Sequence, residues 1–230
     1  MVEKSYRKIC VVIVAGLLGL YGVGSIVGRT VSFASPDDQE VESAINHLHS
    51  SSREERRDAV KYLAGVETDR ASEGLISALD NSDHEVRDTA VRALAERVTM
   101  RGIGNRAVEG LIHGLDNSSE SVRRTAATGL ARAETNRATE GLIHGLDSSD
   151  DAVQRTVVDA LAKRARSGRS SDRAVEGLIH ALDNEEFEIR KTAAMGLRDA
   201  DGDRARDGLK KALSDSDERI RQIARQALRQ

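Results

Sequence analysis

The amino-acid sequence predicts an all-α protein, a right-handed α-solenoid of six helical hairpins that follows one hydrophobic helix at the N-terminus. Three observations predict this fold. A pattern recurs six times between residues 41 and 230, at intervals that alternate between 31 and 36 residues. Within each copy, apolar residues recur at the spacing of a helix face. The chain has one proline and 2% aromatic residues, so aliphatic packing between helices has to hold it together.

Residues 1–30 are predicted to form a membrane anchor or a signal segment. The stretch from Ile9 to Gly28 contains no charged residue, and at about 1.5 Å per helical residue it spans the roughly 30 Å of a bilayer's hydrocarbon core. Cations precede this stretch and only Arg29 follows closely, so the positive-inside rule places the N-terminus in the cytoplasm and the repeat domain outside it. The alternative is a cleaved secretory signal, which leaves the repeat domain secreted.

Residues 31–40 contain the only proline, Pro36, and are predicted to be a linker. The repeat domain then occupies residues 41–230. Its six predicted repeats are 41–68, 69–104, 105–135, 136–171, 172–202 and 203–230. Lys210 takes an isoleucine position in the last repeat and Glu55 a valine position in the first, as expected of repeats that cap the array.

Each repeat is predicted to fold into two helices. The first helix carries the pattern Asp/Asn-Arg-Ala-x-Glu-Gly-Leu-Ile, in which Asp69 and Asn105 are placed to cap free N–H groups. The second helix follows a polar turn, and Ser82 with Glu85 matches a capping box there. Glycines inside the first helix, such as Gly110, cost about 1 kcal/mol relative to alanine, so they predict close contact with a neighbouring helix.

The polar turn and the start of the second helix resemble a known family. The motifs are Asp83 with Val86-Arg87, Val122-Arg123, Asp150 with Val153, Ile189-Arg190, and Asp217 with Ile220-Arg221. Over residues 41–230 they resemble the HEAT-repeat superfamily, in particular the short HEAT-like repeats of the phycobilisome-lyase type. Gln154 departs from the arginine and interrupts the expected Asp/Arg ladder. The resemblance implies a concave binding surface lined by the second helices.

A mostly basic ladder is predicted on the outward side of the second helices. Its cations and the valines that border it are Arg57, Lys61, Arg92, Arg124, Arg155, Lys191, Val60, Val91 and Val158. One hypothesis is that this ladder contacts an acidic or amphipathic protein. The other is that the charges are simply solvated beside the packing between repeats.

Two basic edge loops are predicted where five residues are inserted after the second and fourth repeats. Their cations are Arg97, Arg101, Arg106, Lys163, Arg164, Arg166, Arg169 and Arg173. These loops are candidates for contact with anionic lipid headgroups, a cell-surface polymer or a protein. Alternatively, the cations only complement the C-terminal ends of helices.

The sequence shows no candidate catalytic, cofactor-binding or metal site. His113, His144 and His180 share one repeat position, but each has a glutamate four residues earlier, so we expect solvated Glu/His pairs rather than a metal site. The single cysteine, Cys10, excludes an intrachain disulfide and a multi-cysteine zinc site. Motifs of nucleophilic or phosphate-binding sites are also missing from the sequence.

The predicted function is a non-catalytic scaffold or adaptor that binds a protein on its concave face and is exported and tethered to a membrane. The resemblance implies an alternative, an enzyme or chaperone-like subunit related to bilin lyases. The third alternative is a nucleic-acid-binding protein. The formal net charge is −3 and residues 1–36 contribute +3, which leaves −6 for the remainder and opposes nucleic-acid binding.

Overall fold

The computed structural model describes residues 36–167 and 171–229. They belong to a compact unit, Ser35–Gln230, which is distinct from a second unit, Met1–Ala34. The predicted N-terminal helix, Ile9 to Gly28, lies outside the described residues. Within the described ranges, no helix combines the length and the apolar character that a membrane span requires.

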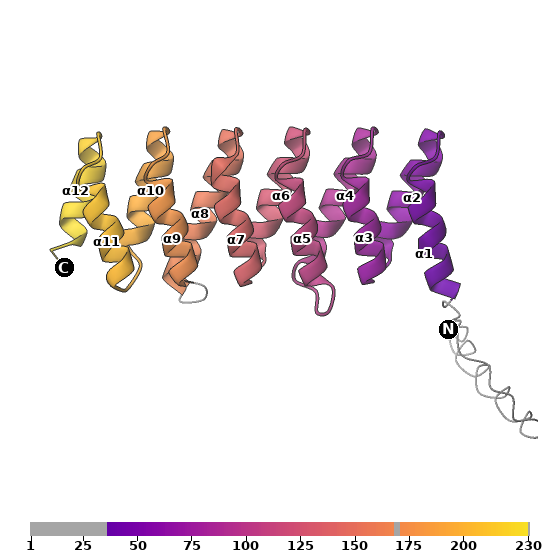
Figure 1. Ribbon diagram of the computed structural model, residues 1–230, viewed down its shortest axis with the longest axis horizontal. Helices are drawn as coiled ribbons and strands as arrows, with labels where there is room; N and C mark the ends of the chain where they lie inside the picture. The colour runs from indigo at the N-terminus through magenta and orange to yellow at the C-terminus, as the bar shows by residue number, and fades with distance from the viewer. Residues whose placement is uncertain (1–35, 168–170, 230) are drawn as a thin grey trace, which may run out of the picture. The chain divides into compact units, whose positions relative to one another are not determined.

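Twelve α-helices within the described residues form six hairpins that stand side by side in a row (Figure 1). The first helices of the hairpins are α1 (Pro36–His47), α3 (Asp69–Ala78), α5 (Gly104–Gly114), α7 (Asn136–His144), α9 (Ser171–Ala181) and α11 (Asp203–Ala212). The second helices are α2 (Arg53–Gly65), α4 (His84–Arg97), α6 (Glu120–Arg132), α8 (Asp151–Ser167), α10 (Phe187–Arg198) and α12 (Glu218–Ala227). A 3-10 turn, η1 (Gly145–Asp147), extends α7.

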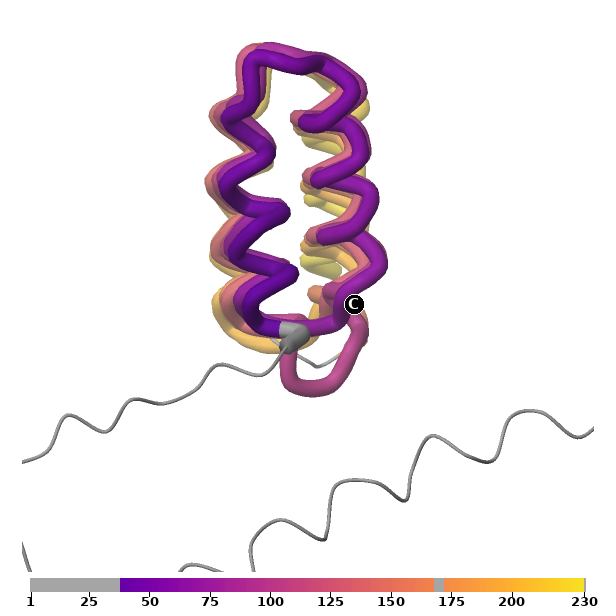
Figure 2. The backbone as a smooth tube through the Cα atoms, turned by 90° about the vertical axis from the view of Figure 1, so that its right-hand side faces the viewer, coloured from indigo at the N-terminus to yellow at the C-terminus, as the bar shows by residue number. Residues whose placement is uncertain are grey.

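The hairpins lie in register with one another. Viewed along the row, the first helices superpose in one layer and the second helices in another (Figure 2). No strand occurs in the described ranges, so the predicted all-α solenoid of helical hairpins is confirmed. Helix α1 begins at Pro36, inside the segment predicted to be a linker. Among the described residues, the buried core side chains form one cluster from Val41 to Ala224, so fragment 35–230 contains a hydrophobic core of its own.

The predicted close contacts at the glycines are confirmed, and they join consecutive repeats. A Cβ atom added to Gly110 would lie 2.6 Å from Ile76 Cγ1 of the preceding repeat. The same isoleucine position meets the same glycine position at every junction, in the pairs Ile45–Gly74, Ile76–Gly110, Ile112–Gly141, Ile143–Gly177 and Ile179–Gly208. We call this set of five contacts the isoleucine–glycine seam. Any side chain at these glycines would push the first helices apart.

The arginine of the Val-Arg motif closes the turn inside each hairpin. Arg87 Nη1 donates to the carbonyl oxygens of Asn81 and Ser82, at 2.6 and 3.1 Å. Equivalent bonds are made by Arg56, Arg123, Arg190 and Arg221. Gln154, which departs from the motif, donates through Nε2 to two turn carbonyls at 2.9 and 2.8 Å. An amide therefore replaces the guanidinium in this role.

The helix caps differ from those predicted. The N-cap of α4 is Asp83, whose carboxylate accepts from the N–H of Glu85, so the predicted capping box at Ser82 is wrong by one residue. Thr68 caps α3, and Asp69 is already inside the helix. Helix α5 begins before Asn105 and has no side-chain cap. Several polar residues precede each helix, and the choice among them depends on which one has an extended backbone.

Replacing Gly110 with alanine tests the isoleucine–glycine seam. Alanine favours a helix by about 1 kcal/mol, but the new methyl group overlaps Ile76 and Leu94, and overpacking of this kind typically costs about 1–3 kcal/mol. We expect Gly110→Ala to lower the free energy of unfolding, measured by urea denaturation of fragment 35–230. Gly65→Ala is the control, because its methyl group would meet nothing within 4 Å. Equal changes in both variants would contradict the seam.

Candidate partner-binding surface

The outward side of the second helices forms a continuous surface along the row, which we call the second-helix face. Four of its cations, Arg57, Arg124, Arg155 and Lys191, occupy equivalent positions on α2, α6, α8 and α10. On the second helices α4, α6, α8 and α10, the residue after this position is a half-buried threonine. These residues are Thr89, Thr125, Thr156 and Thr192. We call them the threonine row. Along each of these second helices, a charged side chain is therefore followed by a short threonine, and the pattern repeats from one second helix to the next.

The four equivalent cations of this face are all bonded to carboxylates. Arg57 donates to both carboxylate oxygens of Asp83, at 2.8 and 3.2 Å. Arg124 donates to Asp150 at 3.2 Å, and Arg155 to Glu186 at 2.6 Å. Each of these acids is at the start of the second helix of the following repeat. The arginines therefore tie successive second helices together.

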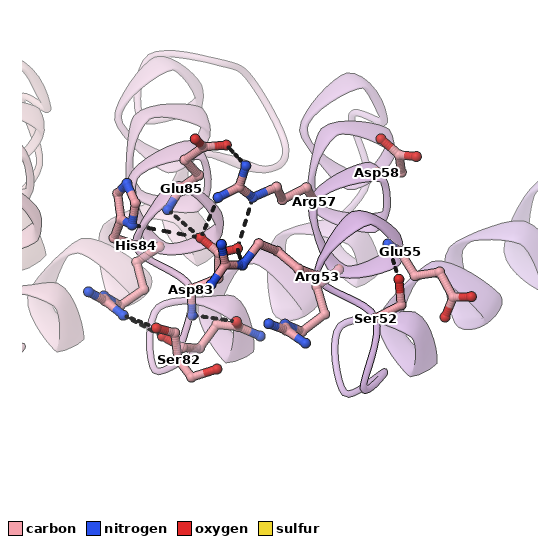
Figure 3. A network of polar contacts seen from close by, with 12 residues as sticks. Ser52, Arg53, Glu55, Arg57, Asp58, Ser82, Asp83, His84 and Glu85 are labelled. Carbon is pink, nitrogen blue, oxygen red and sulfur yellow. Dashed lines mark hydrogen bonds and ion pairs between the residues drawn. The ribbon is translucent and has the colours of Figure 1, made fainter.

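Asp83 is the centre of one such junction (Figure 3). Its side chain is 2% exposed and also lies 3.5 Å from Arg53 Nε. The bond from Arg57, together with the N–H of Glu85, lowers the pKa of Asp83 from 3.8 to about 2, against the desolvation that would raise it. Arg57 extends the network, because its Nη1 lies 2.7 Å from Glu85. The cap and the junction between repeats thus depend on one ionised carboxylate.

The remaining predicted residues of the ladder divide into exposed and buried ones. Lys61 is exposed and lies 3.5 Å from Asp58, and Lys191 lies 2.7 Å from Glu188. Arg92 is exposed and donates to the backbone oxygen of Asp88 at 3.1 Å. The three valines, Val60, Val91 and Val158, are at most 1% exposed. Their predicted place on the border of the surface is wrong, because that side of each second helix packs against the following repeat.

Two of the predicted edge-loop cations are buried inside the array. Arg97 is the last residue of α4 and Arg164 lies in the last turn of α8, and they are 2% and 7% exposed. Arg97 Nη2 donates to the carbonyl oxygens of Leu63 and Val66 at 2.6 and 2.7 Å, and Nη1 donates to Ser72 Oγ at 2.9 Å. The guanidinium thus binds the C-terminal end of α2 in the preceding repeat. Desolvation lowers the pKa of Arg97.

Arg164 repeats this arrangement one pair of repeats later. It donates to Leu130 O at 2.7 Å, to Ala133 O, and to Thr139 Oγ1 at 2.6 Å. The sequence contains a signal for this role, since Arg97 and Arg164, like Ser72 and Thr139, are 67 residues apart. After the fourth repeat the inserted residues lengthen α8 to Ser167, where a loop was predicted, whereas after the second repeat most of them form the predicted loop, residues 98–103. In both repeats an arginine near the end of the second helix is buried between repeats.

The other edge cations have three kinds of position. Arg106 and Arg173 lie on first helices and pair with Glu73 and Glu140 of the preceding repeats. They belong to a ladder of five pairs that also includes Arg70–Glu42, Arg137–Glu109 and Arg204–Glu176. Arg166 lies 3.2 Å from Asp199. Arg101 and Lys163 are exposed. Arg169 lies outside the described residues.

The three histidines pair with a different acid from the one predicted. His113 Nε2 lies 3.1 Å from Asp80, His144 Nε2 lies 3.0 Å from Asp116, and His180 Nε2 lies 3.7 Å from Asp147. Each aspartate lies two or three residues beyond the end of the first helix of the preceding repeat. Stacked first helices bring these residues closer than the glutamate one turn away. No cluster of three potential metal ligands occurs among the described residues.

The six stacked hairpins and their closed turns define a helical-repeat solenoid, an architecture suited to binding proteins. The family model of HEAT repeats matches residues 41–131, 108–168 and 139–229. The chain belongs to the HEAT repeat family.

Solved structures with a similar arrangement include designed and natural proteins. An engineered protein is 26% identical, covers 83% of this chain and 95% of its own, and has a TM-score of 0.46. Designed armadillo repeat proteins for modular peptide recognition are 20% identical, with coverage of 82% and 98% and a TM-score of 0.49. The complex of CpcE and CpcF of phycocyanin lyase from Nostoc is 23% identical, with coverage of 89% and 79% and a TM-score of 0.44. No curated protein matches the chain.

Replacing Asp83 with asparagine tests the junction between the first two repeats. The folded pKa lies below the ordinary value of 3.8, so ionised Asp83 stabilises the fold above about pH 4, and this contribution is lost as the pH falls towards 2. We expect Asp83→Asn to lower the free energy of unfolding by roughly 2 kcal/mol at pH 7 and by much less at pH 2. Urea denaturation across this pH range measures the difference. Glu54→Gln, at an exposed carboxyl of α2, should show no such pH dependence.

Replacing Arg97 with methionine tests the buried guanidinium. Methionine fills much of the same space but removes the charged donor from the carbonyl oxygens of Leu63 and Val66, which keep only the backbone N–H groups of Val66 and Thr68. We therefore expect a loss of about 2 kcal/mol in the free energy of unfolding. Arg101→Met, at an exposed position nearby in sequence, is the matched control. An unchanged midpoint for Arg97→Met would show that Arg97 does not hold the repeats together.

Proposed function

We propose that the protein is a non-catalytic scaffold that binds a protein partner along its second-helix face. The observation that carries the proposal is the regular alternation on this face of the threonine row with charged side chains, repeated from α4 to α10. A partner laid across the row would meet the same chemistry at every repeat. Catalysis is not proposed, because Arg57, Arg124 and Arg155 are engaged in ion pairs between repeats and Lys191 in one within its helix.

The partner is proposed to be acidic or amphipathic. Arg124, Arg155 and Lys191 keep part of their surface in solvent although they are paired, so a carboxylate from a partner can add a further bond to each. Apolar surface is also present, since Met195 on α10 and Tyr62 on α2 are 38% and 36% exposed. An amphipathic helix presents both kinds of group.

The proposal includes export and attachment to a membrane. It rests on the uncharged stretch from Ile9 to Gly28 and on the cations that precede it. We expect a native N-terminus that retains this stretch, measured by mass spectrometry, and repeats that are cleaved when protease is added to intact cells. Repeats that resist protease until the cells are lysed would contradict export.

Blocking the threonine row tests the binding face. Thr125→Arg combined with Thr156→Arg places two long side chains in the row, and we expect loss of the partner recovered from native extracts by fragment 35–230. Ser77→Arg is the matched control, because it makes the same kind of change at an exposed position of the first-helix layer. Circular dichroism and the unfolding midpoint check that both variants fold.

The cations themselves are tested by milder changes. Full charge reversal at Arg124 or Arg155 would place like charges against Asp150 or Glu186 and weaken the array. Arg124→Gln, Arg155→Gln and Lys191→Gln avoid this repulsion, and together they should reduce partner retention. Retention equal to the wild type in both the threonine and the glutamine variants would place the binding site elsewhere.

A further inference from the structure

One cavity in the array contains a buried guanidinium. It has a volume of about 60 Å³ and lies between the ends of α6 and α8 and the start of α7, which are neighbours in Figure 1. Ala131 and Ala160 provide apolar surface, and Lys163 and Arg164 provide positively charged donors. The hydroxyls of Thr139 and Ser167 also line the cavity, and they donate to the carbonyl oxygens of Thr135 and Arg164. A water molecule needs about 10–15 Å³ measured in this way, so the cavity has room for a carboxylate group and the carbon that carries it.

The charge of this cavity is not balanced. The three acceptors of Arg164 described above are uncharged oxygens, and Lys163 adds a second positive charge at its exposed edge. Glu134 also lines the cavity and supplies one negative charge. Two cations and one anion leave a net charge of +1. A positive charge removed from water is stabilised by an anion that can reach it.

The equivalent place one pair of repeats earlier provides a comparison within the same molecule. Arg97, Glu67 and Ser72 correspond to Arg164, Glu134 and Thr139, but Glu96 stands where the later repeat has Lys163. Both Glu67 and Glu96 act on Arg97 to raise its pKa, whereas Glu134 alone acts on Arg164 in this way. The earlier group therefore has a net charge of −1. The two sites share the same arrangement of residues, but their net charges have opposite signs.

We infer that the cavity beside Arg164 binds a carboxylate side chain of the protein partner, and that Lys163 makes this repeat, rather than its counterpart at Arg97, the anchoring point. The carboxylate lies against Lys163 Nζ beside the guanidinium of Arg164, and its stem contacts Ala131 and Ala160. This inference rests on the proposed function and deepens it, because it assigns an acidic residue of the partner to one place at the ends of the second helices α6 and α8.

The test is a nuclear magnetic resonance titration of fragment 35–230 with an end-blocked alanine pentapeptide that carries one central glutamate. We expect saturable shifts at Thr139, Lys163 and Arg164 and none at Ser72 and Arg97. Lys163→Glu, an exposed change that leaves the core intact, should weaken binding at least about tenfold, because it reverses one charge beside the ligand. The glutamine analogue of the peptide should give no shifts.

Three outcomes would overturn the inference. They are shifts of equal size at the Arg97 and Arg164 sites, shifts that survive Lys163→Glu, and acetate that binds as tightly as the peptide, since the last would assign the site to small free carboxylates. Partner capture separates this result from the proposed function. If Lys163→Glu retains the partner and the threonine-row variant loses it, the proposed function is supported and the anchoring point at Lys163 is rejected. If both variants retain the partner, both proposals are rejected.

Discussion

The isoleucine–glycine seam is the contact on which the rest of the solenoid depends. Each first helix from α1 to α9 presents one isoleucine to the next repeat, and it lies so close to the glycine opposite that a single methyl group there would overlap it. Because the same pair recurs at five junctions, every repeat is placed against its neighbour in the same register. That register brings the Arg–Glu ladder, the His–Asp pairs and the arginine–carboxylate junctions into contact. The ion pairs therefore follow from the seam, and the exposed ones, the Arg–Glu ladder and the His–Asp pairs, add little stability by themselves.

The contact between successive second helices alternates between two kinds along the array, which explains the period of two repeats. Where a repeat is extended, as in α4 and α8, a buried arginine binds the end of the preceding second helix. At the following junction, the contact is made instead by glycine, since Gly129 and Gly196 lie against Ala95 and Ala162. One junction is thus held by hydrogen bonds to carbonyl oxygens and the next by close apolar packing.

Much of this could be predicted from the sequence, and the errors have a common physical origin. Helical periodicity and the recurrence of glycine predicted the hairpins and the seam, because these features lie within one repeat. The positions of Val60, Arg97 and His113 were mistaken because each depends on a residue about one repeat away, namely the packing of the next helix, the carbonyl of Leu63 and the carboxylate of Asp80. The 67-residue spacing of Arg97 and Arg164 was the available signal.

The pairing of surface charges changes how the second-helix face can recognise a partner. A free arginine ladder would attract any polyanion, but cations already bonded to carboxylates present local dipoles whose long-range field is weak. Selectivity then has to come from places where the pairing is incomplete. The described structure shows one in which a buried guanidinium with neutral acceptors adjoins a second cation, beside Arg164, while its counterpart at Arg97 is compensated by two glutamates. A repeat protein built from nearly identical units can thus make one unit different by a single exchange of glutamate for lysine.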